Sequence, residues 1–125
     1  TGQVVVLVDD DKLIREAMKL LLDRWGCVSI IAEDMDSALT QVEVRNITPH
    51  LIISDYRLQK NQLGSDVILQ FRDVYGTDIP AIIITGDTAP ERLKEINVCN
   101  ASLMHKPVSP AKLRLMIEML LNREK

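Results

Sequence analysis

The segment VVVLVDDD, residues 4–11, sets five consecutive apolar residues directly before three aspartates. A continuous β-branched run of this kind is typical of a strand that is buried on both faces of a parallel sheet. Beyond the aspartates, apolar residues recur at steps of three and four between Ile14 and Trp25, which predicts a helix that ends at Gly26. The chain therefore opens with a buried strand, an acidic turn and a helix.

The same alternation repeats along the rest of the chain. Further apolar runs predict strands over 28–32, 51–54, 81–84 and, more weakly, 101–104. Helical patterns follow them, from a cap at Asp34 or Asp36 to about Asn46, over 67–74, from Pro90 to about 98, and over 110–121. Five alternations predict an α/β fold, a doubly wound five-stranded parallel sheet with helices on both faces. We expect residues 1–125 to form a single domain.

Composition excludes several functional classes. The chain has 46% hydrophobic and 26% charged residues and a net charge of −3, which argues against binding to nucleic acid. No apolar stretch approaches the roughly 18–20 residues of a membrane span, so we expect no membrane contact by this domain. The two cysteines lack metal-site spacing and fit a reducing cytoplasm, although the parent chain could be membrane-anchored. Because the sequence begins with Thr1 rather than Met, we expect either an excised piece or a chain with added residues at Thr1 and Gly2.

Acidic residues follow two of the predicted strands. Asp9, Asp10 and Asp11 come after the first strand, and Asp55 follows the third. In open α/β sheets the carboxyl ends of the strands carry the ligand site, so we expect Asp9, Asp10 and Asp55 to converge there. Crowded carboxylates resist ionisation, and a hard cation such as Mg²⁺ relieves their repulsion. We expect Asp11 to cap the first helix instead.

Two other polar residues end the neighbouring strands. Thr85 and Gly86 follow the fourth strand, and Lys106 with Pro107 follows the fifth. A compact ammonium and a hydroxyl donor beside a magnesium site suit a phosphate group. An aspartate exposed there could itself be the nucleophile for a phosphoryl group.

Taken together, these motifs resemble the receiver domain of two-component response regulators, and the resemblance covers essentially the whole chain. It rests on the segment Val8-Asp9-Asp10, on Asp55 after an apolar strand, and on the pairs Thr85-Gly86 and Lys106-Pro107, all in the family's order. The resemblance implies a flavodoxin-like sheet with strand order 2-1-3-4-5.

The resemblance also implies a role for each site residue. Asp55 would be the phosphoacceptor, taking a phosphoryl group from a phosphohistidine of a histidine kinase or a histidine phosphotransfer domain. Asp9, Asp10, Asp55 and the backbone carbonyl of Arg57 would hold Mg²⁺, with Mn²⁺ as a possible substitute. Lys106 and Thr85 would contact the phosphoryl group, and the Lys106–Pro107 peptide is often cis in this family. The domain would catalyse its own phosphorylation and slow dephosphorylation, and a histidine kinase is one possible parent chain.

Three features depart from the family pattern or refine it. The loop after Asp55 reaches its first glycine, Gly64, nine residues on rather than eight, so it is one residue longer. Leu103 stands where many receivers carry Tyr or Phe, which puts the coupled movement of Thr85 and an aromatic ring in doubt. The segment 104–114 looks like the receivers at the C-terminal end of hybrid sensor histidine kinases; a stand-alone receiver or half of a regulator is the alternative.

Several readings remain open at this level. Leu13, Ala17 and Leu20 form a strip on the first helix that could dock a phosphodonor helix bundle or simply pack in the core. Arg57 and Asp87 could tune loss of the phosphoryl group. A pseudo-receiver that only binds proteins, a small aspartyl-phosphate hydrolase and a possible homodimer are the competing functional and oligomeric readings.

Overall fold

The computed structural model describes residues 2–59, 61–76, 78–86 and 100–122. The strands of this part are β1 (Val4–Val8), β2 (Val28–Ala32), β3 (Leu51–Asp55), β4 (Ala81–Thr85) and β5 (Ser102–His105). The helices are α1 (Lys12–Arg24), α2 (Met35–Arg45), α3 (Gly64–Tyr75) and α5 (Pro110–Asn122). The helix expected after Pro90 lies outside the described residues.

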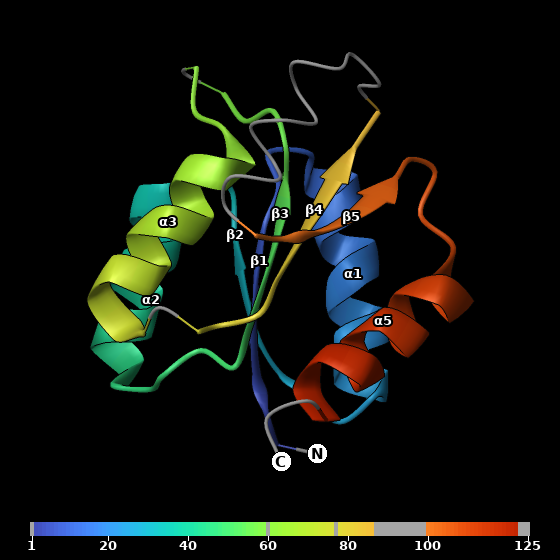
Figure 1. The fold of residues 1–125 in the computed structure, drawn as a ribbon, viewed down its shortest axis with the longest axis horizontal. Coiled ribbons are helices and arrows are strands. Elements are labelled where there is room, and N and C mark those ends of the chain that lie inside the picture. The colour runs from blue at the N-terminus through green and yellow to red at the C-terminus, as the bar shows by residue number, and fades with distance from the viewer. Residues whose placement is uncertain (1, 60, 77, 87–99, 123–125) are drawn as a thin grey trace.

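The five strands form one sheet in the order β2-β1-β3-β4-β5, and every neighbouring pair is parallel. The doubly wound, flavodoxin-like order is thereby confirmed. Helices α2 and α3 cover one face of the sheet, and α1 and α5 cover the other (Figure 1). The strand order reverses beside β1 and β3, so the ends of these two strands flank the switch point where such sheets bind ligands.

Each face of the sheet has its own hydrophobic core. Val4, Val6 and Val8 of β1 pack in the cluster that includes α2 and α3, whereas Val5 and Leu7 pack in the cluster that includes α1 and α5. Because successive side chains of a strand point to opposite faces, a strand between two helical layers must be apolar at every position. The valine run of β1 meets this requirement.

The strand ends differ slightly from the sequence prediction. β3 and β4 each run one residue further, so Asp55 and Thr85 are the last residues of their strands. β5 is shifted by one residue, from 101–104 to Ser102–His105, because its pairing with β4 extends to Thr85 opposite His105. The strand ends therefore carry the polar residues directly.

The helix boundaries follow local capping. The Asp11 side chain accepts hydrogen bonds from the backbone of Leu13 and begins α1, as expected. Asp34, rather than Asp36, caps α2 by accepting from Ser37 N at 2.8 Å. Asn46 ends α2 in a left-handed conformation with φ 52°. In the described residues no helix is both long enough and apolar enough to cross a membrane.

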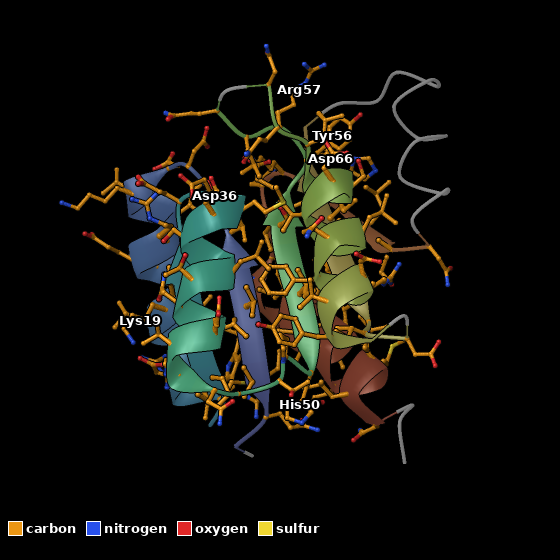
Figure 2. All side chains as sticks on the ribbon, turned by 90° about the vertical axis from the view of Figure 1, so that its left-hand side faces the viewer. Lys19, Asp36, His50, Tyr56, Arg57 and Asp66 are labelled. Atoms are coloured by element: carbon orange, nitrogen blue, oxygen red, sulfur yellow. The ribbon has the colours of Figure 1, made fainter. Side chains whose placement is uncertain are left out.

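His50 joins the amino ends of β1 and β3. The backbone N–H of Val4 donates to His50 Nδ1 at 2.9 Å, and the His50 N–H donates to the Val4 carbonyl at 2.8 Å. Figure 2 places His50 at the end of the sheet opposite to Tyr56 and Arg57. The His50 imidazole therefore stabilises the pairing of β1 and β3 at the end of the sheet opposite to the acidic strand ends.

Candidate functional site

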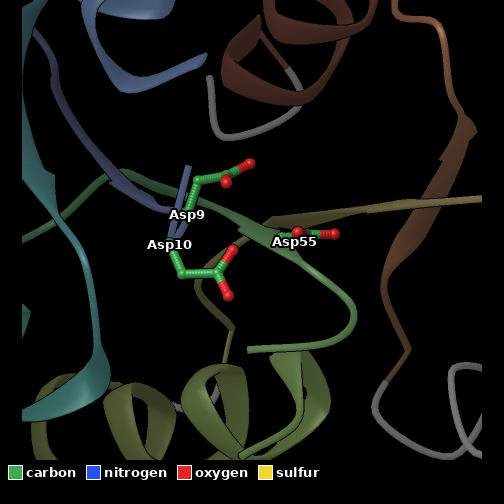
Figure 3. A group of neighbouring side chains, drawn as sticks. All are labelled: Asp9, Asp10 and Asp55. Carbon is green, nitrogen blue, oxygen red and sulfur yellow. The ribbon is translucent and has the colours of Figure 1, made fainter. Parts of the chain in front are cut away.

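Three aspartates meet at the carboxyl ends of β1 and β3. Asp9 and Asp10 follow β1, Asp55 ends β3, and one carboxylate oxygen of each lies within 4.8 Å of the others. Figure 3 shows these side chains grouped where the two strands end. Asp9 is 1% exposed and Asp55 is 7% exposed, while Asp10 is half-buried. The predicted convergence of the three carboxylates is confirmed.

The turn after β1 holds Asp9 through several hydrogen bonds. Asp9 Oδ1 accepts from the backbone N–H of Asp11 at 2.9 Å. The main-chain carbonyl of Asp9 accepts from Arg15 Nη1 at 2.8 Å. Sequence reasoning missed Arg15; the available signal was a guanidinium within the first turns of the helix that follows the acidic run.

Lys106 contributes a positively charged side chain to the site. Its Nζ lies 3.2 Å from Asp55 Oδ2, and its backbone N–H donates to the carbonyl of Thr85 at 3.0 Å. The peptide that follows, Lys106–Pro107, is cis, as the family resemblance implied. Thr85 itself is buried at the end of β4. The ends of β3, β4 and β5 therefore bring a carboxylate, a hydroxyl residue and an ammonium to one place.

Burial makes the carboxylates costly to ionise without a counter-charge. Burial raises the pKa of Asp9 to about 6, with smaller raising effects from Asp55 and Asp10. Burial also raises the pKa of Asp55, and the Lys106 ammonium acts in the opposite direction. Oxygen ligands that crowd together and resist ionisation fit a hard divalent cation, because its charge removes both the desolvation cost and the mutual repulsion.

The longer loop after Asp55 folds into a small hairpin. Arg57 pairs with Leu63 in an antiparallel bridge, and Leu58 N donates to the Gln62 carbonyl at 2.9 Å. Gly64 N donates to the Tyr56 carbonyl at 2.7 Å on the other side of the bridge. Since both bonds flank the Arg57–Leu63 pair, the Arg57 carbonyl is directed away from Leu63.

Tyr56 corrects the sequence prediction. By its position Tyr56 is the first residue of the loop after Asp55, where an exposed side chain is expected, but its side chain is fully buried in the core cluster beside α3. Its backbone N–H donates to the Ile84 carbonyl at 2.8 Å, which extends the pairing of β3 with β4 past Asp55. The loop thus starts from an anchored residue.

A groove of about 580 Å³ runs from the site along α1. Asp9 and Lys106 line it at one end, together with apolar residues of α1 and of the segment after β5, among them Ala17, Met18 and Val108. Leu13 and Leu20 are 75% and 70% exposed and Ala17 is exposed as well, so the core-packing reading of this strip is wrong. An apolar surface adjoins the acidic site.

Two further candidate residues, Leu103 and His105, belong to β5. Leu103 is half-buried against the core cluster that includes α2 and α3. His105 lines a different groove, between β5 and α5, whereas Lys106 lines the groove along α1. Asp87 and Cys99 lie outside the described residues.

Curated proteins similar to this chain are regulators of about twice its length. A phosphate regulon transcriptional regulatory protein, PhoB, of Klebsiella pneumoniae is 28% identical over 120 residues, which are 95% of this chain and 52% of that protein. A probable transcriptional regulator, ycf27, of Cyanophora paradoxa is 31% identical over 121 residues, 95% of this chain and 48% of that protein. The chain spans about half the length of the curated relatives it matches.

Solved structures show the same fold. A CheY-like response regulator receiver domain of Methanospirillum hungatei superposes with a TM-score of 0.87 at 23% identity, covering 98% of this chain and 96% of that one. A response regulator receiver protein of Pseudomonas putida gives a TM-score of 0.82 at 25% identity, covering 95% and 98%. Residues 5–118 match the family described as response regulator receiver domain. With this match, the sheet order and the acidic strand ends, the chain belongs to the response regulator receiver domain family of two-component systems.

Proposed function

We propose that this domain accepts a phosphoryl group on Asp55 from the phosphohistidine of a histidine kinase or a histidine phosphotransfer domain. The observation that carries the proposal is the site itself. The carboxylates of Asp9, Asp10 and Asp55 lie within 4.8 Å of one another, and Lys106 Nζ is 3.2 Å from Asp55 Oδ2. The receiver reading is favoured over a pseudo-receiver because no part of this set is missing.

Asp55 acts as the nucleophile. One of its carboxylate oxygens bonds to the phosphorus while the P–N bond to the donor imidazole breaks. The imidazole nitrogen keeps the electron pair of that bond and takes up a proton, and Asp55 becomes an acyl phosphate. Lys106 balances charge on the phosphoryl oxygens, and Thr85 donates its hydroxyl hydrogen to one of them.

The cation site is formed by the carboxylates of Asp9, Asp10 and Asp55 together with the Arg57 carbonyl. Bound Mg²⁺, or Mn²⁺ in its place, would neutralise charge on the phosphoryl oxygens during in-line transfer. The orientation of the Arg57 carbonyl away from Leu63 supports its place among these ligands. Asp11 stays outside the set because its carboxylate is engaged in capping α1.

The phosphodonor docks on α1 and the segment after β5. The groove there is continuous with the site, since Asp9 and Lys106 line it, and the exposed Leu13–Ala17–Leu20 strip lies on the same helix. A helix bundle that presents a phosphohistidine at the Asp55 end of this groove fits both features. This docking explains why large apolar side chains are exposed beside a polar site.

Phosphorylation then shifts a conformational equilibrium through Thr85, whose carbonyl bonds the backbone of Lys106. With Leu103 in place of an aromatic residue, we propose that the domain relays phosphate more than it switches an output through β5. We propose that the domain lies in the cytoplasm and that its parent is a hybrid sensor histidine kinase, whose chain could be membrane-anchored. The alternative is a stand-alone receiver or the receiver half of a regulator, and the length of the relatives, about twice that of this chain, is consistent with the second of these.

The test is intact mass after incubation with phosphoramidate. The wild-type chain should gain one phosphoryl group with Mg²⁺ and none with a chelator. Asp55→Asn should gain none, whereas Asp36→Asn, an exposed carboxylate in the first turn of α2, should behave as wild type. A wild type that gains no mass either with Mg²⁺ or with the chelator would favour the pseudo-receiver hypothesis.

A further inference from the structure

Arg15 reaches from α1 back to the end of β1. Its Nη1 donates to the main-chain carbonyl of Asp9 at 2.8 Å. Its own backbone N–H donates to the Asp11 carbonyl at 3.0 Å, and the Asp11 side chain caps the same helix. The capped first turn of α1 therefore fixes the position of the Arg15 backbone, and the hydrogen bond to Asp9 fixes the position of its guanidinium.

The guanidinium bonds a carbonyl although three carboxylates lie nearby. Among the described residues, the ion pair that reaches this cluster is the one between the Lys106 ammonium and the Asp55 carboxylate. Arg15 instead contacts the peptide group that joins Asp9 to Asp10. Because a peptide group is planar and rigid, a bond to the Asp9 carbonyl also fixes the Asp10 nitrogen. One hydrogen bond thus holds the link between two carboxylates of the site.

We propose that Arg15 is a positioning residue for the cation site, which holds the Asp9–Asp10 peptide so that both carboxylates face the cation. This inference rests on the proposed function, because it assumes that the cluster binds Mg²⁺. Removal of a group that hydrogen-bonds a metal ligand without itself touching the metal commonly weakens metal binding by roughly 10- to 100-fold. Arg15 acts in this way through a main-chain carbonyl.

A purely electrostatic role predicts the opposite effect. A positive charge close to a cation site repels the cation, so removal of Arg15 for charge reasons alone would tighten Mg²⁺ binding. Removal of a positioning bond weakens it. The sign of the change in affinity therefore separates the two roles.

The experiment is a calorimetric titration of the whole chain with MgCl₂. Arg15→Met keeps a long apolar stem but removes the donor and the charge, and Arg15→Lys keeps the charge but loses the forked donor. Arg24→Met, in the last turn of the same helix and exposed, is the matched control. We expect Mg²⁺ to bind Arg15→Met about tenfold more weakly than wild type, Arg15→Lys with an intermediate affinity, and the control as tightly as wild type.

Two further readouts keep the inference testable. The Asp10 amide belongs to the peptide that Arg15 bonds, so its ¹⁵N resonance should move in Arg15→Met without Mg²⁺ and stay in place in the control. If Arg15→Met does not fold, the Arg15→Lys titration decides, since a charge role predicts no change there. Arg15 variants that bind Mg²⁺ as tightly as wild type, or more tightly, overturn the inference. A wild type that binds no Mg²⁺ overturns the proposed cation site instead.

Discussion

Gly64, the first residue of α3, packs directly against the main chain of Asp55. A Cβ placed on Gly64 would lie 2.5 Å from the Asp55 carbonyl oxygen and 3.0 Å from Ser54 Oγ. The Ser54 hydroxyl also donates to this carbonyl, at 2.9 Å. The absence of a side chain at Gly64 therefore lets α3 begin against the residue that we propose as the phosphoacceptor.

Gly64→Ala should accordingly destabilise the domain. The obstructing atoms are backbone at Asp55, so either β3 or α3 must move, and overpacking of this kind costs about 1–3 kcal/mol. Urea unfolding measures the loss. Gly86→Ala is the control, because a Cβ there meets nothing within 4 Å. Equal stability of the two variants would show that the close packing of Gly64 against the Asp55 main chain does not limit the side chain at position 64.

Lys106→Met should slow phosphorylation without unfolding the domain. The variant removes the ammonium 3.2 Å from Asp55 Oδ2, and loss of one preorganised charge partner of a transition state costs about a hundredfold in rate. The rate is measured with phosphoramidate at saturating Mg²⁺. Lys19→Met removes an exposed lysine that also pairs with an aspartate, Asp23 at 2.9 Å, and should leave the rate unchanged. Similar rates for the two variants would contradict the role of Lys106.

Asp9 should make the stability of the metal-free domain depend on pH. Burial holds its pKa at about 6 in the folded state, above the 3.8 of an unperturbed aspartate, so the folded state binds the proton more tightly. The contribution of Asp9 to the free energy of unfolding is therefore full below about pH 4 and is lost as the pH rises through 6. The charge that remains at neutral pH is destabilising without a cation.

The measurement compares Asp9→Asn with wild type by urea unfolding in a chelator. Asparagine keeps an oxygen acceptor for the Asp11 N–H but carries no charge. At pH 7.5 we expect the free energy of unfolding of the variant to exceed that of the wild type by on the order of 1 kcal/mol or more, and near pH 4.5 the difference should shrink to roughly a third of that value. Addition of Mg²⁺ at pH 7.5 should raise the stability of the wild type relative to the variant. A stability difference that is the same at every pH would contradict the burial argument.

The α1 strip should matter for a protein donor and not for a small one. Leu13→Gln with Leu20→Gln removes exposed apolar contacts, and loss of about 1.4 kcal/mol of docking energy weakens binding about tenfold. Val44→Gln is the control, since Val44 is 78% exposed but lies on α2, across the sheet. Phosphotransfer should be followed from a purified phosphotransfer domain that phosphorylates the wild type, with phosphoramidate in parallel. An equal loss with both donors would show that the strip supports the site rather than docking.

Most of the fold could be predicted because the signals are local. The apolar run of residues 4–8 does not fit a sheet with one solvated face. The polar residues that follow the first, third and fifth runs, among them Asp9, Asp55 and Lys106, are those that meet at the site. Asp9, Asp55 and Lys106 were found in this way, although Asp55 and Lys106 are 51 positions apart. Parallel strands bring their carboxyl ends together whatever the length of the connections.

The contacts that depend on side-chain direction could not be predicted. Arg15 reaches the Asp9 carbonyl because α1 begins at the Asp11 cap, which turns Arg15 toward the end of β1. From sequence alone, an arginine on an amphipathic helix indicates only a solvated face. Tyr56 is buried because its backbone extends the pairing of β3 with β4 into what looks like a polar loop. The extra residue after Asp55 predicted a longer loop, but it did not predict that the loop folds into a hairpin closed by the Arg57–Leu63 bridge.

The position of the phosphoryl group on Asp55 can be tested directly by chemical trapping. The wild-type chain is incubated with phosphoramidate and Mg²⁺ and then treated with borohydride, which reduces an acyl phosphate to an alcohol and releases phosphate. Peptide mass spectrometry then locates the product. We expect homoserine at position 55 and unchanged aspartate at positions 9 and 10. Homoserine at position 9 or 10, or at none of the three, would contradict this expectation.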